Sequence, residues 1–315
     1  MRVTRGVIAV GLAALLTLGS APGAGAGPVH RGAAATTADP LVAAAGDIAC
    51  DPSSSKFRNG QGTSSACKQK ATSDLVLSEP LDAVLALGDN QYECGSTQQY
   101  QKSFDPSWGR FKSMIHPVPG DNEYGTGANG CSSSAAGYFQ YFGAAAGNSR
   151  GDSAFTLGAW RLIGLNAECS HAGGCGSSSP QATFLRSQLG SAKCTIVYWH
   201  QPYYNGTSHS SSSYRAFWDI LYAQHADIVL NGHLHNYARF APQDASGHVD
   251  AAHGVRQFIV GTGGRSLFSL DGTRNVETTT KQYGILELRL HATSYHWAFV
   301  NTSGTVVDSG DADCN

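Results

Sequence analysis

Residues 81–92, LDAVLALGDNQY, decide how the rest of the chain is interpreted. Their first eight positions are mostly apolar, and a run of this length is typical of a buried β-strand. Gly88 and Asp89 stand at the end of this run and just beyond it. Glycine lets the backbone approach another group closely, and a carboxylate at that point can bind a metal ion or mark a turn. The stretch therefore predicts a strand that ends in a ligand.

The same arrangement recurs along the chain. Each repetition is an apolar run followed by aspartate or histidine: LVAAAG (41–46) before Asp47, MIHPVPG (114–120) before Asp121, CTIVYW (194–199) before His200, and ADIVLNG (226–232) before His233 and His235. A further run, FIVGTGG (258–264), ends in a glycine turn. These runs predict buried strands.

Helical patterns lie between the predicted strands. Residues 214–222 place aromatic and leucine side chains at the spacing of a buried helix face. By contrast, residues 283–310 are rich in β-branched and aromatic residues with turn breaks, which predicts antiparallel strands. The fold class is therefore α/β, a layered domain with mixed sheets. We expect the polar residues at the strand ends to converge on one sheet edge, where α/β proteins bind ligands.

The residues at the strand ends have the chemistry of a metal site. They are three carboxylates and three imidazoles: Asp47, Asp89, Asp121, His200, His233 and His235. Such mixed oxygen and nitrogen ligands suit zinc, iron or manganese. Six or seven ligands exceed what one four-coordinate ion needs, and they suit two ions that share a carboxylate. Two such ions can hold a phosphoryl group and activate water.

Five segments together resemble a known family. They are GDIA (46–49), GDNQY (88–92), PGDNEY (119–124), VYWHQP (197–202) and NGHLH (231–235). In these segments the chain resembles the calcineurin-like metallophosphoesterases, in the branch of the purple acid phosphatases and their secreted bacterial relatives. The resemblance implies a four-layer α/β/β/α sandwich. It also implies hydrolysis of phosphate monoesters through a metal-bound hydroxide.

The resemblance also implies how the metals are held. Most members have a histidine two residues after the first aspartate, where this chain has Ala49. Purple acid phosphatases lack that histidine and use a tyrosine three residues after the second aspartate, which is Tyr92 here. The implied ligands are Asp47, Asp89, Tyr92 and His235 for one ion, and Asp89, Asp121, His200 and His233 for the other. A tyrosinate favours Fe(III), paired with divalent iron, zinc or manganese. The alternative for Tyr92 is an ordinary packed tyrosine.

The chain departs from the family pattern at residues 120–123. The family usually has Gly-Asn-His followed by an acidic residue, whereas this chain has Gly-Asp-Asn-Glu. Asn122 therefore stands at the place of the catalytic histidine, and an amide cannot act as a general acid. We expect Asn122 to hydrogen-bond a phosphate oxygen. His209, nine residues after His200, is the substitute candidate for the acid, and a solvent-exposed loop histidine is its alternative.

Two rival functions stay open at this point. One is a phosphodiesterase that acts on lipid head groups or nucleotides. The other is a metal-binding or phosphate-binding protein without turnover, which Asn122 favours. Arg265 in the GTGGR turn (261–265) is a candidate for contacting an anion, although the turn is otherwise an ordinary tight one.

The N-terminus predicts export. Two arginines precede an apolar stretch at 6–19, and Ala24-Gly25-Ala26 has small residues where a signal peptidase cuts. The alternative is a membrane anchor, but fourteen apolar residues are too few to span a bilayer, which needs about 20. We therefore expect a signal peptide over 1–26, a linker over 27–40 and one phosphoesterase domain over 41–315.

Cysteine count and charge agree with a secreted enzyme. Eight cysteines in an exported chain suggest disulfides, and a thiolate metal site is the alternative. Proximity along the chain favours Cys50–Cys67 and Cys169–Cys175, while Cys194–Cys314 would hold the C-terminus. With 21 basic and 23 acidic residues, the net charge is −2. No specific nucleic-acid binding, membrane span or obligate protein partner is expected.

Overall fold

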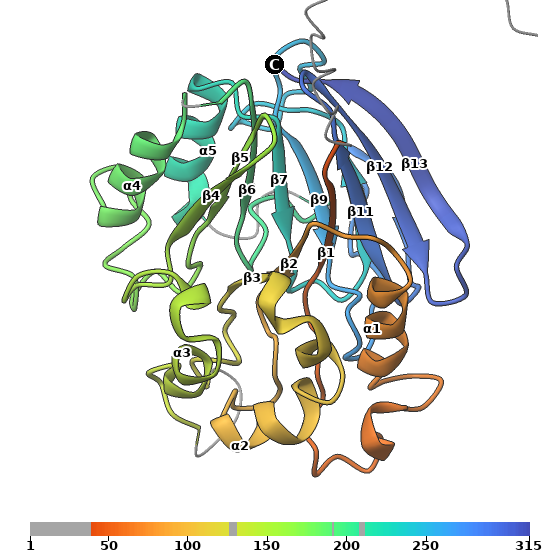
Figure 1. Ribbon diagram of the computed structural model, residues 1–315. Helices are drawn as coiled ribbons and strands as arrows, with labels where there is room; N and C mark the ends of the chain where they lie inside the picture. The colour runs from red at the N-terminus through yellow and green to blue at the C-terminus, as the bar shows by residue number, and fades with distance from the viewer. Residues whose placement is uncertain (1–38, 126–130, 191, 208–211) are drawn as a thin grey trace, which may run out of the picture. The chain divides into compact units, whose positions relative to one another are not determined.

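Two mixed β-sheets form the scaffold of the protein (Figure 1). The structure is a computed structural model that describes residues 39–125, 131–190, 192–207 and 212–315. Within these residues one sheet has the order β13-β12-β11-β1-β2-β3 and the other β10-β8-β9-β7-β6-β5-β4. The strands are β1 (Leu41–Ala45), β2 (Ala83–Leu87), β3 (Ile115–Val118), β4 (Ser153–Leu157), β5 (Trp160–Gly164), β6 (Cys194–Tyr198), β7 (Ile228–Asn231), β8 (Tyr237–Phe240), β9 (Arg256–Val260), β10 (Val276–Thr280), β11 (Gly284–Leu290), β12 (Ser294–Asn301) and β13 (Val306–Asp313).

Helices cover the outer faces of both sheets. They are α1 (Gln69–Leu77), α2 (Thr97–Gln99), α3 (Ala136–Phe142), α4 (Pro180–Gln188) and α5 (Arg215–Ala223). Segments of 3-10 or π helix lie at Arg58–Gly60, Tyr100–Phe104, Trp108–Met114, Gly143–Ala146 and Ser212–Tyr214. In Figure 1, α4 and α5 lie beside the second sheet, and α1 lies on the opposite side, beside the first sheet.

The alternation of side chains along β6 shows why the layers form. Ile196 and Tyr198 pack in the core that contains residues of both sheets. Val197 and Trp199 point the other way and pack with Phe217 and other residues of α5. Successive side chains of a strand point to opposite faces, so a strand that is apolar throughout has both faces buried. The predicted α/β/β/α sandwich with mixed sheets is therefore confirmed.

Within each sheet, the strands that precede the predicted ligands are parallel to one another. β1 pairs with β2 and β2 with β3 in one sheet, and β6 pairs with β5 and β7 in the other. Every residue of β1, β2 and β6 is buried. Their carboxyl ends meet at one edge, as the contact of the His200 ring with the carbonyl of Leu87 shows. The predicted convergence of polar residues is therefore confirmed.

Sequence patterns predicted the strands of the first sheet and the central strands of the second, and missed the outer strands of the second sheet. β4 and β10 form the two edges of the second sheet and are only partly buried, so neither contains a continuous apolar run. β5 and β8 are interrupted by Arg161 and Arg239. The antiparallel C-terminal strands β11, β12 and β13 were predicted and are confirmed.

Four disulfides link segments of the chain. The three expected pairs, Cys50–Cys67, Cys169–Cys175 and Cys194–Cys314, are all formed. The fourth, Cys94–Cys131, joins the two remaining cysteines. Because the structure leaves none of these eight cysteines free, the alternative of a thiolate metal site is wrong.

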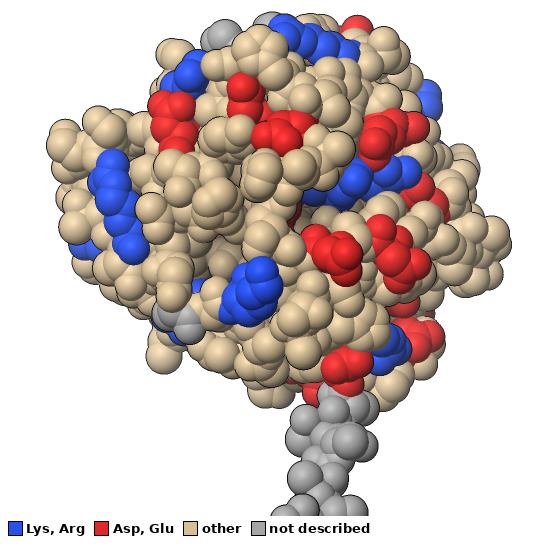
Figure 2. Space-filling model, turned by 90° about the horizontal axis from the view of Figure 1, so that it is seen from above, with Lys and Arg blue, Asp and Glu red and all other residues tan. Residues whose placement is uncertain are grey.

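Charges on the surface are mixed. Figure 2 shows the face seen from above in Figure 1, where acidic and basic side chains alternate without a broad patch of either sign. In the part of the chain that the structure describes, no helix has the length and apolar character needed to cross a membrane. The predicted signal peptide (1–26) and nearly all of the linker (27–40) lie outside the described residues and stay predictions.

The C-terminus is held at the beginning of β7. Asp227 accepts hydrogen bonds from the backbone N–H groups of Thr195, at 2.6 Å, and Asn315, at 2.7 Å. The Cys194–Cys314 disulfide lies beside these contacts in the chain. Burial raises the pKa of Asp227 to about 6 despite these hydrogen bonds.

This raised pKa predicts a pH-dependent stability. Because the folded protein holds the Asp227 proton more tightly than the unfolded chain, the contribution is complete below the unfolded pKa and is lost as the pH rises through about 6. Asp227→Asn cannot titrate. We expect the unfolding free energy of the wild type, relative to this variant, to fall by about 2–3 kcal/mol from pH 4 to pH 7.

Denaturant titrations across this pH range measure the difference. Asp219→Asn, at an exposed carboxyl on α5, is the matched control. A constant difference between the wild type and Asp227→Asn would contradict the prediction.

Candidate metal centre

The structure brings together all seven residues predicted as metal ligands. The three aspartates follow β1, β2 and β3, and the histidines follow β6 and β7. Tyr92 lies in the loop after β2. Asp47, Asp89, Tyr92 and His200 are almost completely buried, whereas Asp121, His233 and His235 are partly exposed. The cluster is therefore open to solvent on one side.

One half of the cluster is built around Asp47. Its Oδ1 atom accepts a hydrogen bond from the Tyr92 hydroxyl at 2.8 Å and lies 3.1 Å from Nε2 of His235. The same nitrogen lies 3.1 Å from the Tyr92 oxygen. The other carboxylate oxygen of Asp47 accepts the backbone N–H of His233 at 2.8 Å. Three potential ligand atoms thus face one another.

The other half is built around Asp121. Its Oδ1 atom lies 3.0 Å from Nε2 of His200 and 3.1 Å from Nδ1 of His233. Oδ1 of Asp89 lies 3.3 Å from the same His200 nitrogen. Since Asp89 lies between the two halves, it has the place that a bridging carboxylate needs.

The contacts of the two His200 ring nitrogens show whether these residues suit a metal ion. Its Nδ1 lies 2.8 Å from the carbonyl of Leu87, and a carbonyl can only accept, so Nδ1 carries a hydrogen. Nε2 is completely buried and makes no well-aligned hydrogen bond with any described residue. In the neutral ring, its lone pair therefore faces two carboxylates. A cation between these atoms relieves that repulsion, so the residues present fit a metal.

Distances among the ligand atoms agree with this fit. Asp121, His200 and His233 each offer one ligand atom within 4.8 Å of the others, and so do Asp47, Asp89 and His200. A histidine whose second nitrogen donates to a backbone carbonyl is the usual arrangement for a metal ligand, because that bond fixes the ring. The cluster therefore has the composition and spacing of a site for two metal ions.

The charges of the carboxylates and imidazoles shift one another's pKa values in the cluster. Burial by itself would raise the pKa of Asp47, but His235 and His200 outweigh it and lower the pKa. Burial would likewise lower the pKa of His200, but Asp89 and Asp121 raise it well above its usual value. Without metal, protons on the imidazoles offset the carboxylates. Metal binding should therefore release protons.

Tyr92 keeps its proton in the absence of metal. Burial, followed by the charges of Asp47 and Asp89, raises its pKa well above 10. Its hydroxyl accordingly donates to Asp47. Coordination as tyrosinate would require an ion acidic enough to displace this proton.

The ligand turns pack so closely that glycine is needed at two positions. A Cβ at Gly120 would lie 2.3 Å from Oδ1 of Asp89, and a Cβ at Gly88 would lie 2.6 Å from Nδ1 of His200. Gly88 also has a φ of +84°. The neighbouring Asp89 has a φ of 48°, a left-handed conformation that aspartate tolerates better than most residues.

Of the two predicted catalytic residues, Asn122 and His209, the structure describes only Asn122. Asn122 lies beside the cluster, where its backbone N–H donates to Oδ1 of Asp89 at 2.9 Å and its side-chain amide to Oδ2 at 2.6 Å. It therefore orients Asp89, in addition to any contact with phosphate. His209 lies outside the described residues, and its role as the acid stays a prediction.

Glu123 is a residue of the site that the sequence analysis did not identify. Its side chain is fully buried and accepts hydrogen bonds from the backbone N–H groups of Gln91, at 3.0 Å, and Gly120, at 2.7 Å, and from the Tyr100 hydroxyl, at 3.0 Å. It thereby ties the turn after β2 to the turn after β3. Burial and the charge of Asp89 raise its pKa to about 8. An acidic residue beside Asn122 was the only signal in the sequence.

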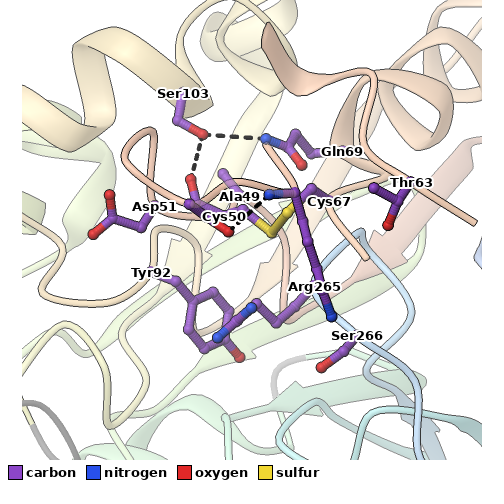
Figure 3. Close-up of a disulfide and its surroundings, with 12 residues drawn as sticks. Ala49, Cys50, Asp51, Thr63, Cys67, Gln69, Tyr92, Ser103, Arg265 and Ser266 are labelled. Atoms are coloured by element: carbon purple, nitrogen blue, oxygen red, sulfur yellow. Dashed lines mark hydrogen bonds between the residues drawn. A yellow bond between two sulfur atoms is a disulfide. The ribbon is translucent and has the colours of Figure 1, made fainter. Parts of the chain in front are cut away.

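Arg265 lies against Tyr92. Its guanidinium is centred 4.9 Å from the Tyr92 ring and pairs with Glu93 at 2.5 Å. The backbone carbonyl of Arg265 accepts the N–H of Cys67 at 3.0 Å, which joins this segment to the Cys50–Cys67 disulfide. Figure 3 shows Tyr92 and Arg265 next to this disulfide. Arg265 therefore lies beside a predicted ligand, and its contact with an anion stays a prediction.

A cavity of about 310 Å³ opens over the cluster. It is lined by predicted ligands together with charged and polar neighbours: Asp89, Tyr92, Glu93, Asp121, Asn122, His233, His235, Arg265, Ser266 and Phe268. This volume is at the lower end of the roughly 300–1,000 Å³ that small-molecule sites occupy. The ligand atoms are thus accessible to a small molecule.

Comparisons with known proteins agree with this geometry. The profile of the calcineurin-like phosphoesterase family matches residues 42–237. A purple acid phosphatase from yellow lupin (Lupinus luteus) seeds has a similar fold, with 17% identity and a TM-score of 0.65 over 87% of this chain and 53% of the lupin chain. The present chain thus spans about half the length of the lupin structure. A search of curated proteins finds no match.

Two further solved structures share the fold. A dimetal phosphatase from Danio rerio is 12% identical, with a TM-score of 0.53 over 89% of this chain and all of the other. GAP50, the anchor in the inner membrane complex of Plasmodium, is 15% identical, with a TM-score of 0.58 over 89% of this chain and 90% of the other. At such identities the likeness shows the fold alone.

Proposed function

Because the chain belongs to the calcineurin-like phosphoesterase family, we propose that it is a secreted, metal-dependent phosphatase that hydrolyses phosphate monoesters. The observation that carries the proposal is the orientation of His200. Its buried Nε2 faces the carboxylates of Asp89 and Asp121 without a well-aligned hydrogen bond among the described residues. Two carboxylates that converge on one buried imidazole nitrogen are the arrangement expected around a cation, and this supports a ligand role for His200.

The metal ligands, Asn122 and the residues that line the cavity have different proposed roles in the reaction. When bound, two metal ions would supply an activated water and positive charge for displacement at phosphorus. Asp89 is the ligand that the two ions would share, and Asn122 holds its carboxylate through two hydrogen bonds. His233 and Arg265 line the cavity where the phosphate oxygens would lie, so they can stabilise their charge.

The ligand set supports a particular pair of metals. We assign Asp47, Asp89, Tyr92 and His235 to one ion, and Asp89, Asp121, His200 and His233 to the other. The raised pKa of Tyr92 means that only a strongly acidic ion would displace its proton. This favours Fe(III) in the first position, with divalent iron, zinc or manganese in the second.

Leaving-group protonation depends on residues other than Asn122, because an amide carries no acidic proton near neutral pH. His209 is the proposed acid. Without such an acid the enzyme would prefer esters whose alcohol leaves readily.

Export is part of the proposal. Four disulfides suit an oxidising compartment. N-terminal sequencing of the exported protein tests the predicted cleavage after Ala26.

One rival is favoured by a specific observation. Asn122 at the position of the family's catalytic histidine agrees with a metal-binding or phosphate-binding protein without turnover. The complete ligand set argues against it, because binding alone would not require two adjacent ions. A phosphodiesterase is the other alternative.

Hydrolysis of 4-nitrophenyl phosphate by the metal-loaded protein tests the proposal, with bis(4-nitrophenyl) phosphate as the diester. We expect turnover of the monoester, its loss on treatment with a chelator, and its recovery when metal is restored, since the ions supply the attacking water. Turnover of the diester alone would identify a phosphodiesterase. Bound metal without turnover of either ester would identify a binding protein.

A further inference from the structure

A second cavity adjoins the one over the metal cluster. It measures about 330 Å³ and shares His233, His235 and Phe268 with the first cavity. Its other lining includes Leu234 and Leu270, so part of its wall is apolar. A phosphate group over the ligand atoms would therefore have the rest of its ester next to this second cavity.

Phe268 stands at the junction of the two cavities. Its side chain is 57% exposed, which is unusual for a phenylalanine. Its ring stacks on His235 with 5.0 Å between centroids and a 23° angle between planes. Its backbone N–H donates to the carbonyl of His235 at 2.8 Å. The ring is thus held in place beside the metal cluster, with much of its surface uncovered.

Two polar residues belong to the lining of the second cavity, Asn236 and Asp271. Asn236 is almost completely buried, so it contributes little polar surface to the cavity. Asp271 is exposed at the cavity and disfavours a second anionic group there.

From these features we propose that the second cavity binds the alcohol portion of the substrate, and that this portion carries an aromatic ring and no anionic group. The inference rests on the proposed phosphatase function and names its substrate class. An exposed, fixed aromatic ring beside an apolar wall favours stacking with another ring. The substrate is thus an aromatic phosphate monoester with no second anionic group.

Three phosphates of primary alcohols distinguish binding in the second cavity from differences in leaving-group reactivity. Benzyl phosphate carries an aromatic ring, cyclohexylmethyl phosphate has similar size without aromaticity, and ethyl phosphate has neither. We expect kcat/KM to fall in that order. Because all three leaving groups are primary alkoxides, their intrinsic reactivities are similar, and the differences report binding next to phosphorus.

Variants of Phe268 test whether this residue causes the preference for the aromatic substrate. We expect Phe268→Ala to lower the ratio of kcat/KM for benzyl over ethyl phosphate about tenfold, through loss of ring stacking and apolar contact. Phe268→Leu should restore the ratio for cyclohexylmethyl phosphate but not for benzyl phosphate. If the substitution disturbs His235, it should lower kcat/KM for both substrates equally. The ratio of the two kcat/KM values is then unchanged. Val306→Ala, at an exposed apolar position on β13, is the control and should leave the ratios unchanged.

An unchanged benzyl-to-ethyl ratio in Phe268→Ala would overturn the proposal while leaving the phosphatase function intact. If no ester is hydrolysed, the phosphatase function fails instead. The second cavity is then tested by calorimetric binding of benzylphosphonate and methylphosphonate to the metal-loaded protein. A benzyl preference that is lost about tenfold in Phe268→Ala would support the site, and equal binding of the two phosphonates would refute it.

Discussion

Asp89→Asn should remove the second metal ion and lower kcat by more than about 100-fold. Loss of an outer hydrogen-bonding partner of a metal ligand already costs roughly 10–100-fold in affinity or activity, and a bridging ligand contributes to both ions. Asparagine has one charge fewer. It would also place an amide N–H₂ group where Asp89 now accepts hydrogen bonds from Asn122. The expected result is loss of metal and of turnover together.

Elemental analysis and turnover of 4-nitrophenyl phosphate measure the two effects. Asp74→Asn is the control, because Asp74 is an exposed carboxylate on α1 that pairs with Lys70 and Arg110. It should retain both metals and full activity. An Asp89→Asn protein with two ions and wild-type turnover would rule out a bridging role for this carboxylate.

Glu123→Ala should destabilise the protein by at least about 3 kcal/mol. The substitution leaves three buried donors, the N–H groups of Gln91 and Gly120 and the hydroxyl of Tyr100, without their acceptor. Each unsatisfied buried group costs about 1–3 kcal/mol, and a cavity adds to this. Because these bonds join the turns that carry Asp89 and Asp121, turnover should fall as well.

Glu123→Gln tests the hydrogen bonds separately from the volume. Glutamine keeps one acceptor oxygen and the shape of the side chain, so we expect a cost of only about 1–2 kcal/mol. Glu79→Ala, at an exposed glutamate after α1, should change the free energy of unfolding by less than about 0.5 kcal/mol. Denaturant unfolding of the three variants provides the comparison. Equal stability of Glu123→Ala and Glu79→Ala would show that Glu123 does not hold the turns together.

Much of the fold and the candidate site could be predicted from local patterns. A strand buried on both faces must be apolar throughout, and the ligand directly after it is displayed at the sheet edge by the geometry of parallel strands. Asp47, Asp89 and His200 satisfy both conditions. Their convergence could therefore be predicted from the short apolar run that precedes each of them. Edge strands such as β4 and β10 lack this signal, because one of their faces meets solvent.

The order of amino acids is enough to predict which residues stand at the strand ends, and therefore the chemistry of the cluster and its family. Which other groups support that cluster depends on the packing of the folded chain. Glu123 joins two turns that are about thirty residues apart in the chain, and Phe268 reaches His235 from a separate loop. Such contacts depend on the packing of distant segments, and the local sequence around each residue carries no pattern that specifies its partner.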